Sequence, residues 1–218
     1  MIVLGLTGSV GMGKSAVAKM ARDMGIPTYS ADEAVHDVLD KGGCAVAPVA
    51  KAFPETLKRG KIDRKLLGGA VFGKPEKLRR LEEIIHPLIT KAEKDFLREA
   101  RRAKARAALL EIPLLFETGA ERRCDLVLCA SAPRAVQKAR VLKRPNMDVK
   151  KFRALLKRQM PNAEKCKRAD YRIPTGVSLA ETRKYVRRLF EELGLMKTAP
   201  KSSKRLQDGQ GRSTSRKP

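Results

Sequence analysis

Aromatic residues are rare in this sequence: phenylalanine, tyrosine and tryptophan together make up 4% of its 218 residues, and tryptophan is absent. The core must therefore be built from leucine, isoleucine, valine and alanine. With 42% hydrophobic residues, we expect a packed globule rather than a disordered chain. No apolar run reaches the roughly 18 residues of a membrane-spanning helix, and Ile2–Leu6 is too short for the core of a signal peptide. We therefore expect a cytoplasmic protein without a membrane segment.

Residues that bind soft metals are also few. The cysteines are Cys44, Cys124, Cys129 and Cys166, and the histidines are His36 and His86. No C-x-x-C spacing occurs, which argues against a zinc site. We expect the cysteines to be reduced thiols in a reducing compartment, most of them serving only as packing residues.

Acidic residues are outnumbered: 48 basic against 24 acidic residues give a net charge of +24. Residues 1–50 carry four basic and five acidic side chains, so the whole excess lies downstream. Such a charge favours polyanions, but no aromatic platform or nucleic-acid motif accompanies it. A general solubility bias without a specific partner therefore stays open. We expect nucleic acid to bind only non-specifically, through a basic disordered tail at 196–218 that is almost free of apolar residues.

Strand patterns and helix patterns alternate along the chain, which predicts a parallel α/β sheet. Strands are predicted over 1–7, 26–29, 107–112, 125–130 and 171–173. Helices are predicted over 14–24, in two short pieces within 32–53, over 75–106, from Pro133 onward, over 149–160 and over 178–193. Pro87 lies inside the longest helical pattern, so we expect a kink or a helix boundary near His86.

A phosphate-binding loop is the clearest motif. Residues 8–15 read Gly-Ser-Val-Gly-Met-Gly-Lys-Ser and fit G-x-x-x-x-G-K-[S/T], between a predicted strand and a predicted helix. The glycines let backbone N–H groups turn inward, and the start of the helix adds partial positive charge. Lys14 would neutralise the β- and γ-phosphates, and Ser15 would offer its hydroxyl to Mg²⁺. The motif predicts binding of a nucleoside triphosphate.

The loop alone does not separate a kinase from a GTPase or an ATPase. The chain barely exceeds one domain, and the Asn/Thr-Lys-x-Asp signature of guanine recognition is absent. Asp32 follows the second predicted strand, at the sheet edge where ligands gather. Its carboxylate could accept the proton of an attacking hydroxyl or hold Mg²⁺ through water. Alternatively, Asp32 could cap the helix that follows.

Two arginines add a third signal. Arg140 and Arg144 are four residues apart, hence on one face of a predicted helix that ends near Pro145. Arginines on a mobile segment can close over ATP and stabilise charge on a transferring phosphoryl group. In so basic a chain they could equally form a solvated basic face.

From Val3 to about Leu193 the sequence resembles the dephospho-CoA kinase family. The matching segments are Leu6-Thr7-Gly8, Ala31-Asp32, His86-Pro87-Leu88-Ile89, Pro113-Leu114-Leu115-Phe116-Glu117, Gln137 with Arg140 and Arg144, Gln159, and Ala169-Asp170-Tyr171. The phosphate-binding loop is common to many families. The segments at His86 and at Pro113–Glu117, in this order and spacing, are far more specific.

The resemblance implies an α/β fold with the parallel-sheet P-loop NTPase core of nucleoside and nucleotide kinases. It implies one kinase domain over 1–195, with an inserted helical coenzyme-A-side subdomain at about 35–95 and a small helical lid at about 143–165. The implied reaction is ATP-dependent phosphorylation of the ribose 3′-hydroxyl of dephospho-CoA, the last step of coenzyme A biosynthesis. The implied partners are ATP with Mg²⁺ and dephospho-CoA. We expect a monomer, because no heptad pattern or long exposed apolar stripe is evident.

Roles for single residues follow from the same resemblance. Asp32 would be the base or orienting carboxylate, and Lys14 and Arg140 would stabilise the phosphoryl group in flight. The ATP site would comprise Gly8, Gly11, Met12, Gly13, Lys14, Ser15, Ala16 and Arg144, with Mg²⁺ on Ser15, and the acceptor site Thr7, His86, Leu114 and Glu117. His86 could instead be a packed or capping residue, and Glu117 could orient a neighbouring group.

The sequence departs from the family pattern at a few positions. Ser30 stands where an aspartate commonly precedes Ala-Asp, and Ala16 replaces a frequent threonine. Pro174-Thr175 stands where asparagine often precedes glycine, which puts an adenine contact there in question. Two other functions stay open: a P-loop kinase for another small acceptor, such as a nucleoside, nucleotide or sugar acid, and a basic nucleotide-dependent protein that binds nucleic acid.

Overall fold

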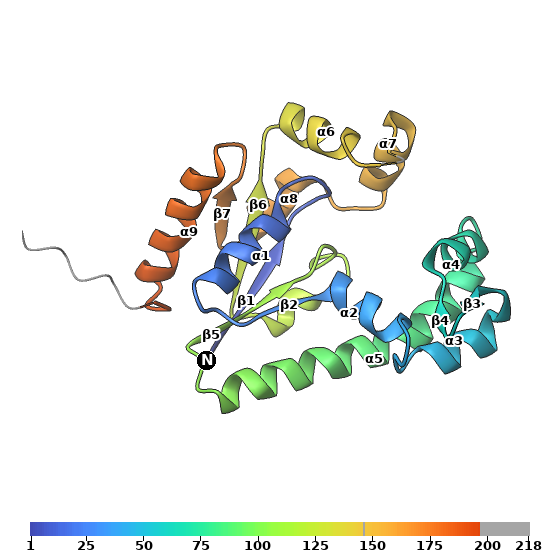
Figure 1. Cartoon of the computed structure of the whole chain (residues 1–218). Coiled ribbons are helices and arrows are strands. Elements are labelled where there is room, and N and C mark those ends of the chain that lie inside the picture. Colours follow the sequence, from blue (N-terminus) through green and yellow to red (C-terminus); the bar gives the residue numbers. More distant parts are fainter. Residues whose placement is uncertain (146, 197–218) are drawn as a thin grey trace, which may run out of the picture.

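A five-stranded sheet of parallel strands forms the centre of the protein, in the order β2-β5-β1-β6-β7 (Figure 1). The strands are β1 (Ile2–Thr7), β2 (Thr28–Ser30), β5 (Ala107–Glu111), β6 (Leu126–Ser131) and β7 (Tyr171–Pro174). The structure is a computed structural model and describes residues 1–145 and 147–196. Apart from Met196, the predicted tail lies outside these residues. The expected parallel α/β fold is confirmed.

Helices cover both faces of the sheet, which is why its strands are continuous apolar runs. Helices α1 (Lys14–Asp23) and α9 (Leu179–Glu192) cover one face, where Leu4 and Leu6 of β1 are buried. Helix α5 (Pro75–Arg102) crosses the other face, where Val3 packs in a core with Leu97. Alternate residues of a strand point to opposite faces, so neighbouring residues of β1 enter different cores.

A second group of helices lies beside the sheet, at the end of α5 far from the N-terminus (Figure 1). We call it the side unit. It comprises α2 (Ala31–Leu39), α3 (Val46–Ala52), the 3₁₀ turn η1 (Pro54–Thr56), the hairpin of β3 (Leu57–Lys58) and β4 (Lys61–Ile62), α4 (Arg64–Val71) and the first half of α5. It has an apolar core of its own that contains Val49, Phe53 and Leu81. The two short helices within 32–53 are confirmed, whereas the hairpin and α4 were not predicted.

The prediction near His86 was a kink or a helix boundary. Helix α5 runs without interruption through Pro87, so the boundary is wrong. Proline removes one helical hydrogen bond and costs about 3 kcal/mol in a helix interior. Packing at both ends offsets this cost. Leu81 and Ile85 are buried in the side unit, and Leu97 is buried against the sheet.

The remaining helical segments follow β5 in the chain. They are the 3₁₀ turn η2 (Ala120–Arg123), α6 (Arg134–Leu142), α7 (Val149–Lys157) and α8 (Asn162–Arg168). The helix predicted over 149–160 is α7 and ends earlier, at Lys157, in line with the effect of Pro161 on the residue before it. Pro161 is the N-cap of α8, a helix that was not predicted. Pro133 likewise precedes α6 as its N-cap rather than being its first residue. Strand β2 starts at Thr28, two residues later than predicted.

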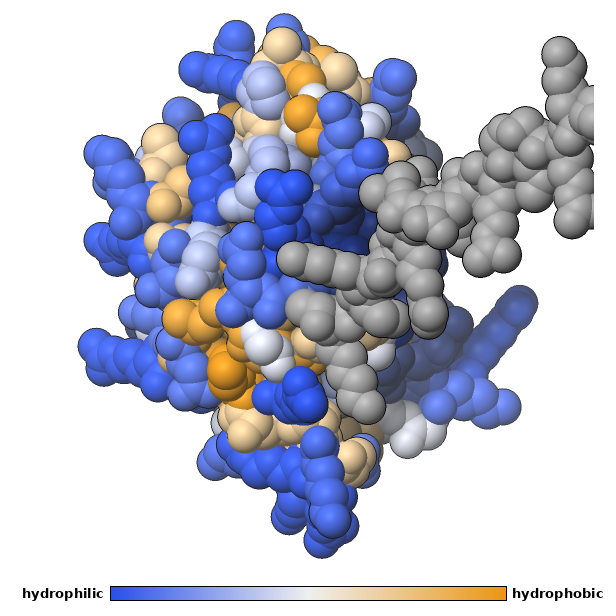
Figure 2. All heavy atoms as spheres, turned by 90° about the vertical axis from the view of Figure 1, so that its left-hand side faces the viewer, coloured by the Kyte–Doolittle hydropathy of each residue, from blue (hydrophilic) through white to orange (hydrophobic). Residues whose placement is uncertain are grey.

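Among the described residues no helix combines the length and the apolar character that crossing a membrane requires. Figure 2 shows the face that carries α9: hydrophilic residues cover most of what is visible, and apolar residues form small groups between them.

Candidate active site

The phosphate-binding loop joins β1 to α1 and depends on its glycines. Gly13 is the N-cap of α1 with a φ of 82°, a backbone conformation that favours glycine. A Cβ atom at this position would lie 3.2 Å from Cβ of Thr175 and 3.4 Å from Nη1 of Arg140. Glycine therefore lets both residues approach the loop closely.

Side chains from segments far along the chain hold the first half of this loop from outside. The backbone N–H of Ser9 donates to Oδ1 of Asn162 (2.8 Å), and that of Val10 donates to Oε1 of Gln159 (2.9 Å). Nε2 of Gln137 donates to the carbonyl of Val10 (2.8 Å). The segment between α7 and α8 is thus attached to the loop, a role that sequence reasoning did not find for Asn162.

Lys14 lies over its own loop, where Nζ donates to the carbonyl of Gly8 (2.8 Å). Burial lowers the pKa of Lys14, and the carboxylates of Glu111 and Asp32 act in the opposite direction. Lys165 and Arg144 lower the pKa of Lys14 further. Lys14 therefore shares its electrostatic surroundings with two carboxylates and two further cations.

Glu111 is a site residue that sequence reasoning missed. It ends β5, is 7% exposed, and accepts a hydrogen bond from Oγ of Ser15 at 2.9 Å. The available signal was an acidic residue at the end of an otherwise apolar strand. Hydroxyl and carboxylate oxygens are the donors that Mg²⁺ prefers, so Ser15 and Glu111, with Asp32 near Lys14, fit a magnesium ion. The described residues contain no cluster of three or more His, Cys, Asp or Glu with metal-binding geometry.

Replacing Glu111 with glutamine is expected to stabilise the protein free of ATP and Mg²⁺. Burial raises the pKa of Glu111 above its ordinary value of 4.5, although the Ser15 hydroxyl and Lys14 oppose this shift. A carboxyl group with a raised pKa in the folded state stabilises the fold at low pH, and this stability is lost as the pH rises through the folded-state pKa. At pH 7 the Glu111→Gln variant should therefore unfold at a temperature roughly 1–4 °C higher.

Thermal unfolding at pH 7 and at pH 4 measures this effect, which should be confined to the higher pH. Glu99→Gln, at an exposed position of α5, is the matched control and should leave the unfolding temperature unchanged. A lower unfolding temperature of Glu111→Gln at pH 7 would show that the charge of Glu111 stabilises the free protein.

Arg140 reaches the loop from the last turn of α6. Its Nη2 donates to the carbonyl of Thr175 at 2.6 Å, while Nη1 is buried and has no hydrogen-bond partner within the described part of the chain. Thr175 in turn donates through Oγ1 to the carbonyl of Met12 (2.7 Å). Thr175, which lies where the sequence departs from the family pattern, thus connects Arg140 with the phosphate-binding loop.

The prediction that Arg144 and Arg140 share a helical face is wrong, because α6 ends at Leu142. Arg144 lies in the turn beyond the helix, just before Pro145, and is exposed. Its charge still contributes to lowering the pKa of Lys14. The two arginines therefore approach the loop from different elements of structure.

Asp32 is not the N-cap of α2, so that alternative is wrong. Ser30 is the N-cap, and its Oγ accepts from the backbone N–H of Glu33 at 3.3 Å. Asp32 lies in the first turn, is exposed, and lines a cavity of about 470 Å³. This cavity, here called the acceptor cavity, also has His86 and Leu114 in its wall.

The structure separates the predicted acceptor residues into two groups. His86 is exposed in the middle of α5, so it is neither a cap nor a packed residue, and it faces the same cavity as Asp32 and Leu114. Thr7 is fully buried and donates to the carbonyl of Pro113 at 3.2 Å. Glu117 accepts from the backbone N–H of Met160 (2.7 Å) and from Nζ of Lys165 (2.9 Å).

Replacing Glu117 with glutamine is expected to reduce stability rather than acceptor affinity. Lys165 is fully buried, and its Nζ lies 2.8 Å from Oε1 of Glu117. Breaking a buried ion pair from one side leaves an uncompensated charge and costs about 3–5 kcal/mol. We expect urea unfolding of Glu117→Gln to show a loss of about 3 kcal/mol, with KM for the acceptor nearly unchanged.

Adding Lys165→Met to Glu117→Gln removes the stranded charge and should restore much of the lost stability. An increase of the acceptor KM without a loss of stability would instead make Glu117 a substrate contact.

A parallel sheet in this strand order, a glycine-rich loop with its lysine, a half-buried arginine beside the loop and a carboxylate in an adjoining cavity define a P-loop kinase. The sequence profile of a family described as "Dephospho-CoA kinase" matches residues 2–181. The chain belongs to the dephospho-CoA kinase family.

Individual relatives agree with this assignment. The chain is 52% identical over 165 residues to the dephospho-CoA kinase of Paramagnetospirillum magneticum, covering 76% of this chain and 78% of that one. It is 46% identical over 193 residues to the dephospho-CoA kinase of Brucella melitensis, covering 88% and 96%. Among solved structures, the dephospho-CoA kinase from Campylobacter jejuni superposes with a TM-score of 0.68 at 29% identity, covering 88% of this chain and 96% of that chain.

Proposed function

We propose that the protein transfers the γ-phosphoryl group of ATP to the ribose 3′-hydroxyl of dephospho-CoA. The observation that supports the site most directly is the buried, unpartnered Nη1 of Arg140 beside Gly13. A buried donor without a partner costs free energy. A phosphate oxygen on the loop would supply the missing acceptor.

The proposed reaction needs one proton acceptor and several charge-stabilising groups. Asp32 accepts the proton of the 3′-hydroxyl, whose oxygen attacks the γ-phosphorus while the bond to the β–γ bridging oxygen breaks. Lys14 and Arg140 stabilise the charge that develops on the phosphoryl group in flight. Ser15 and Glu111 would hold the Mg²⁺ that accompanies ATP, which supplies further charge neutralisation. Positioning and electrostatics therefore provide most of the acceleration.

We place the acceptor in the acceptor cavity, between the side unit and the loop after β5. Leu81, Ile85 and Leu114 give this cavity an apolar wall, and His86 adds a polar group. The coenzyme-A side then corresponds to residues of about 35–95, as the resemblance implies. Thr7 and Glu117 support the wall through Pro113 and Lys165 rather than touching the substrate.

We propose further that residues of about 143–165 close over ATP. Gln159 and Asn162 attach the end of this segment to the phosphate-binding loop, so the moving part is α7. Arg158, just after α7, lies with its guanidinium carbon 5.6 Å from the ring centroid of Phe72 in the side unit. Cation–π contact of this kind is worth about 0.5–1 kcal/mol at exposed sites, enough to favour closure without preventing opening.

One chain supplies every residue of the proposed site, so we propose a catalytic monomer, which size-exclusion chromatography with light scattering tests. The basic tail is not needed for the chemistry. Salt-dependent binding of RNA or DNA that disappears on deletion of residues 197–218 would confine any such binding to the tail.

The direct test of the function is ADP production by the purified protein with ATP and Mg²⁺, with and without dephospho-CoA. Turnover should require dephospho-CoA and yield coenzyme A. A panel of nucleosides, nucleotides and sugar acids serves as the control for acceptor selectivity. ATP binding without stimulation by dephospho-CoA, together with turnover of another acceptor, would reject the proposed substrate but keep the kinase.

A further inference from the structure

Two cysteines that take no part in the proposed phosphoryl transfer lie in direct contact. Cys129 is in β6 and fully buried, whereas Cys166 is in α8 and partly exposed. Their Sγ atoms are 2.9 Å apart, although 37 residues separate them in the sequence. The fold therefore brings together two thiols whose spacing in the sequence does not indicate a pair.

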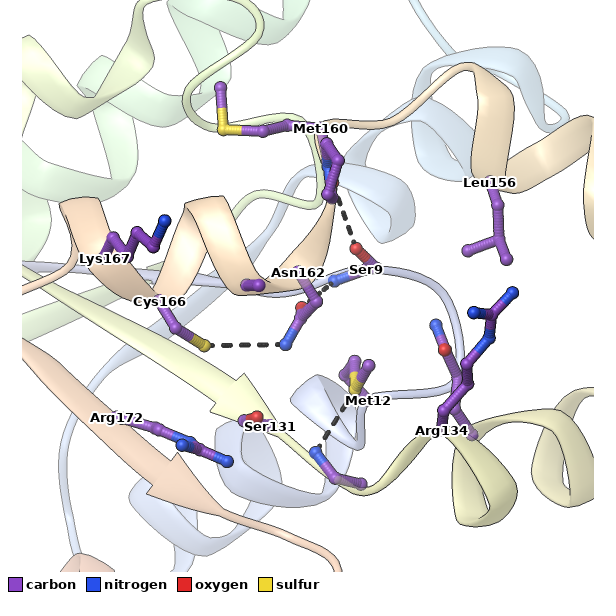
Figure 3. Close-up of a pocket in the computed structure, with 14 residues that line it drawn as sticks. Ser9, Met12, Ser131, Arg134, Leu156, Met160, Asn162, Cys166, Lys167 and Arg172 are labelled. Carbon is purple, nitrogen blue, oxygen red and sulfur yellow. Dashed lines mark hydrogen bonds between the residues drawn. The ribbon is translucent and has the colours of Figure 1, made fainter.

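Cys166 also lines a cavity of about 680 Å³ next to the phosphate-binding loop (Figure 3). Cations surround this cavity in the form of Arg134, Lys167 and Arg172, and its described lining contains no carboxylate. A small molecule from solvent can therefore reach the sulfur of Cys166. Cys129 is fully buried and does not line this cavity.

The two thiols differ in their protonation. The hydrogen bond from Cys129 lowers the pKa of Cys166 to about 6, and Ser131 and Arg172 act in the same direction against burial. The same hydrogen bond and burial raise the pKa of Cys129. These shifts favour Cys166 as the thiolate and Cys129 as the thiol that donates to it. A thiolate is the reactive form of cysteine towards oxidants.

We propose that Cys166 and Cys129 form a modification site for hydroperoxides, in which Cys166 is attacked first and Cys129 resolves the product. The Cys166 thiolate attacks one peroxide oxygen; an S–O bond forms, the O–O bond breaks, and hydroxide leaves and is protonated to water. Sγ of Cys129 then attacks the sulfenic sulfur. The S–S bond forms, the S–O bond breaks, and the departing hydroxide takes the proton of Cys129. In total, two thiols and one hydrogen peroxide give one disulfide and two waters.

The disulfide would join α8 covalently to the central sheet. The same helix carries Asn162, whose Nδ2 donates to Sγ of Cys166 (3.5 Å) and whose Oδ1 accepts from Ser9 of the phosphate-binding loop (Figure 3). It also carries Lys165, which holds the loop after β5 through Pro113. Oxidation would therefore fix the helix that supports the phosphate-binding loop.

The test treats the reduced full-length protein with one equivalent of hydrogen peroxide, blocks the remaining thiols and maps the peptides by mass spectrometry. We expect a linked peptide pair, Cys129 with Cys166, that dithiothreitol reverses. Cys44 is exposed and serves as the internal control. Cys166 should be consumed about threefold faster than Cys44 or more, because its contact with Cys129 favours the thiolate, the form that oxidants attack. Faster oxidation of Cys44, or free thiols at both Cys129 and Cys166, would overturn the proposal.

Two variants separate the roles of the cysteines. In Cys129→Ser the product should stop at the sulfenic acid of Cys166, which dimedone traps. In Cys166→Ser, Cys129 should stay reduced under the same treatment. Oxidation of Cys129 in that variant would contradict the proposed order. The thermal unfolding of wild-type protein provides a test without variants, because a disulfide across 37 residues should raise the unfolding temperature until dithiothreitol is added.

Discussion

Replacement of Arg140 by alanine is expected to lower kcat by about 10³-fold or more, in line with arginines that stabilise a transferring phosphoryl group. Arg140 is bound through Nη2 to Thr175, and its Nη1 is buried beside Gly13 without a partner. The guanidinium is therefore already ordered at the loop before ATP arrives. Steady-state kinetics with varied ATP and dephospho-CoA measure the effect, which should appear in kcat rather than in KM for ATP.

Two further variants make this result specific. Lys138→Ala removes the same charge from an exposed position of the same helix and should leave kcat nearly unchanged. Arg140→Lys keeps the charge but lacks the planar fork that serves Thr175 and the loop together, so it should not restore turnover. A kcat of Arg140→Ala within about tenfold of wild type would limit Arg140 to supporting the loop.

Replacement of Asp32 by asparagine is expected to lower kcat by about 10²- to 10⁴-fold, the range for removal of a general base. An amide has the size of the carboxylate but does not accept the proton of the 3′-hydroxyl. Ser30 is the N-cap of α2, so the variant should keep this helix and its stability. The measurement is dephospho-CoA-dependent ADP formation, together with the unfolding temperature.

The matched control is Asp37→Asn, the same chemical change at an exposed position of the same helix. This control should retain nearly full turnover. If Asp32→Asn raised the KM for dephospho-CoA but kept kcat, Asp32 would position the acceptor without taking its proton. If Asp32→Asn changed neither kcat nor the KM for dephospho-CoA, the base would lie elsewhere in the acceptor cavity.

Local sequence patterns were sufficient for the central sheet and for the phosphate-binding loop. Buried strands are continuous apolar runs between turn residues, and the glycines and Lys14 of the loop are contiguous in the chain. The boundaries that were wrong depend on packing or on a single proline. Helix α5 continues through Pro87 because two different cores bury its ends. The two-residue strands β3 and β4 are too short to leave a periodic pattern.

The site was predictable where a motif carries the chemistry and not where distant residues meet. The resemblance implied that Asp32 acts on the acceptor hydroxyl and that His86 and Leu114 belong to the acceptor site. The structure brings these three residues to one cavity. The bond between Asn162 and Ser9 spans 153 residues, and that between Arg140 and Thr175 joins α6 to the end of the sheet. Such pairs leave no local signal. Glu117 lies in a specific motif, but only its contact with Lys165 indicates that it supports the wall.

Helix α5 also constrains how the length of this protein can change during evolution. The helix has 28 residues and no break, and it contributes Leu81 to one core and Leu97 to the other. One inserted or deleted residue between them would rotate one core against the other by about 100° and shift it by about 1.5 Å. His86 would then leave the face of the helix that lines the acceptor cavity. The number of residues from Leu81 to Leu97 must therefore stay constant in relatives, and changes of length are expected outside this stretch.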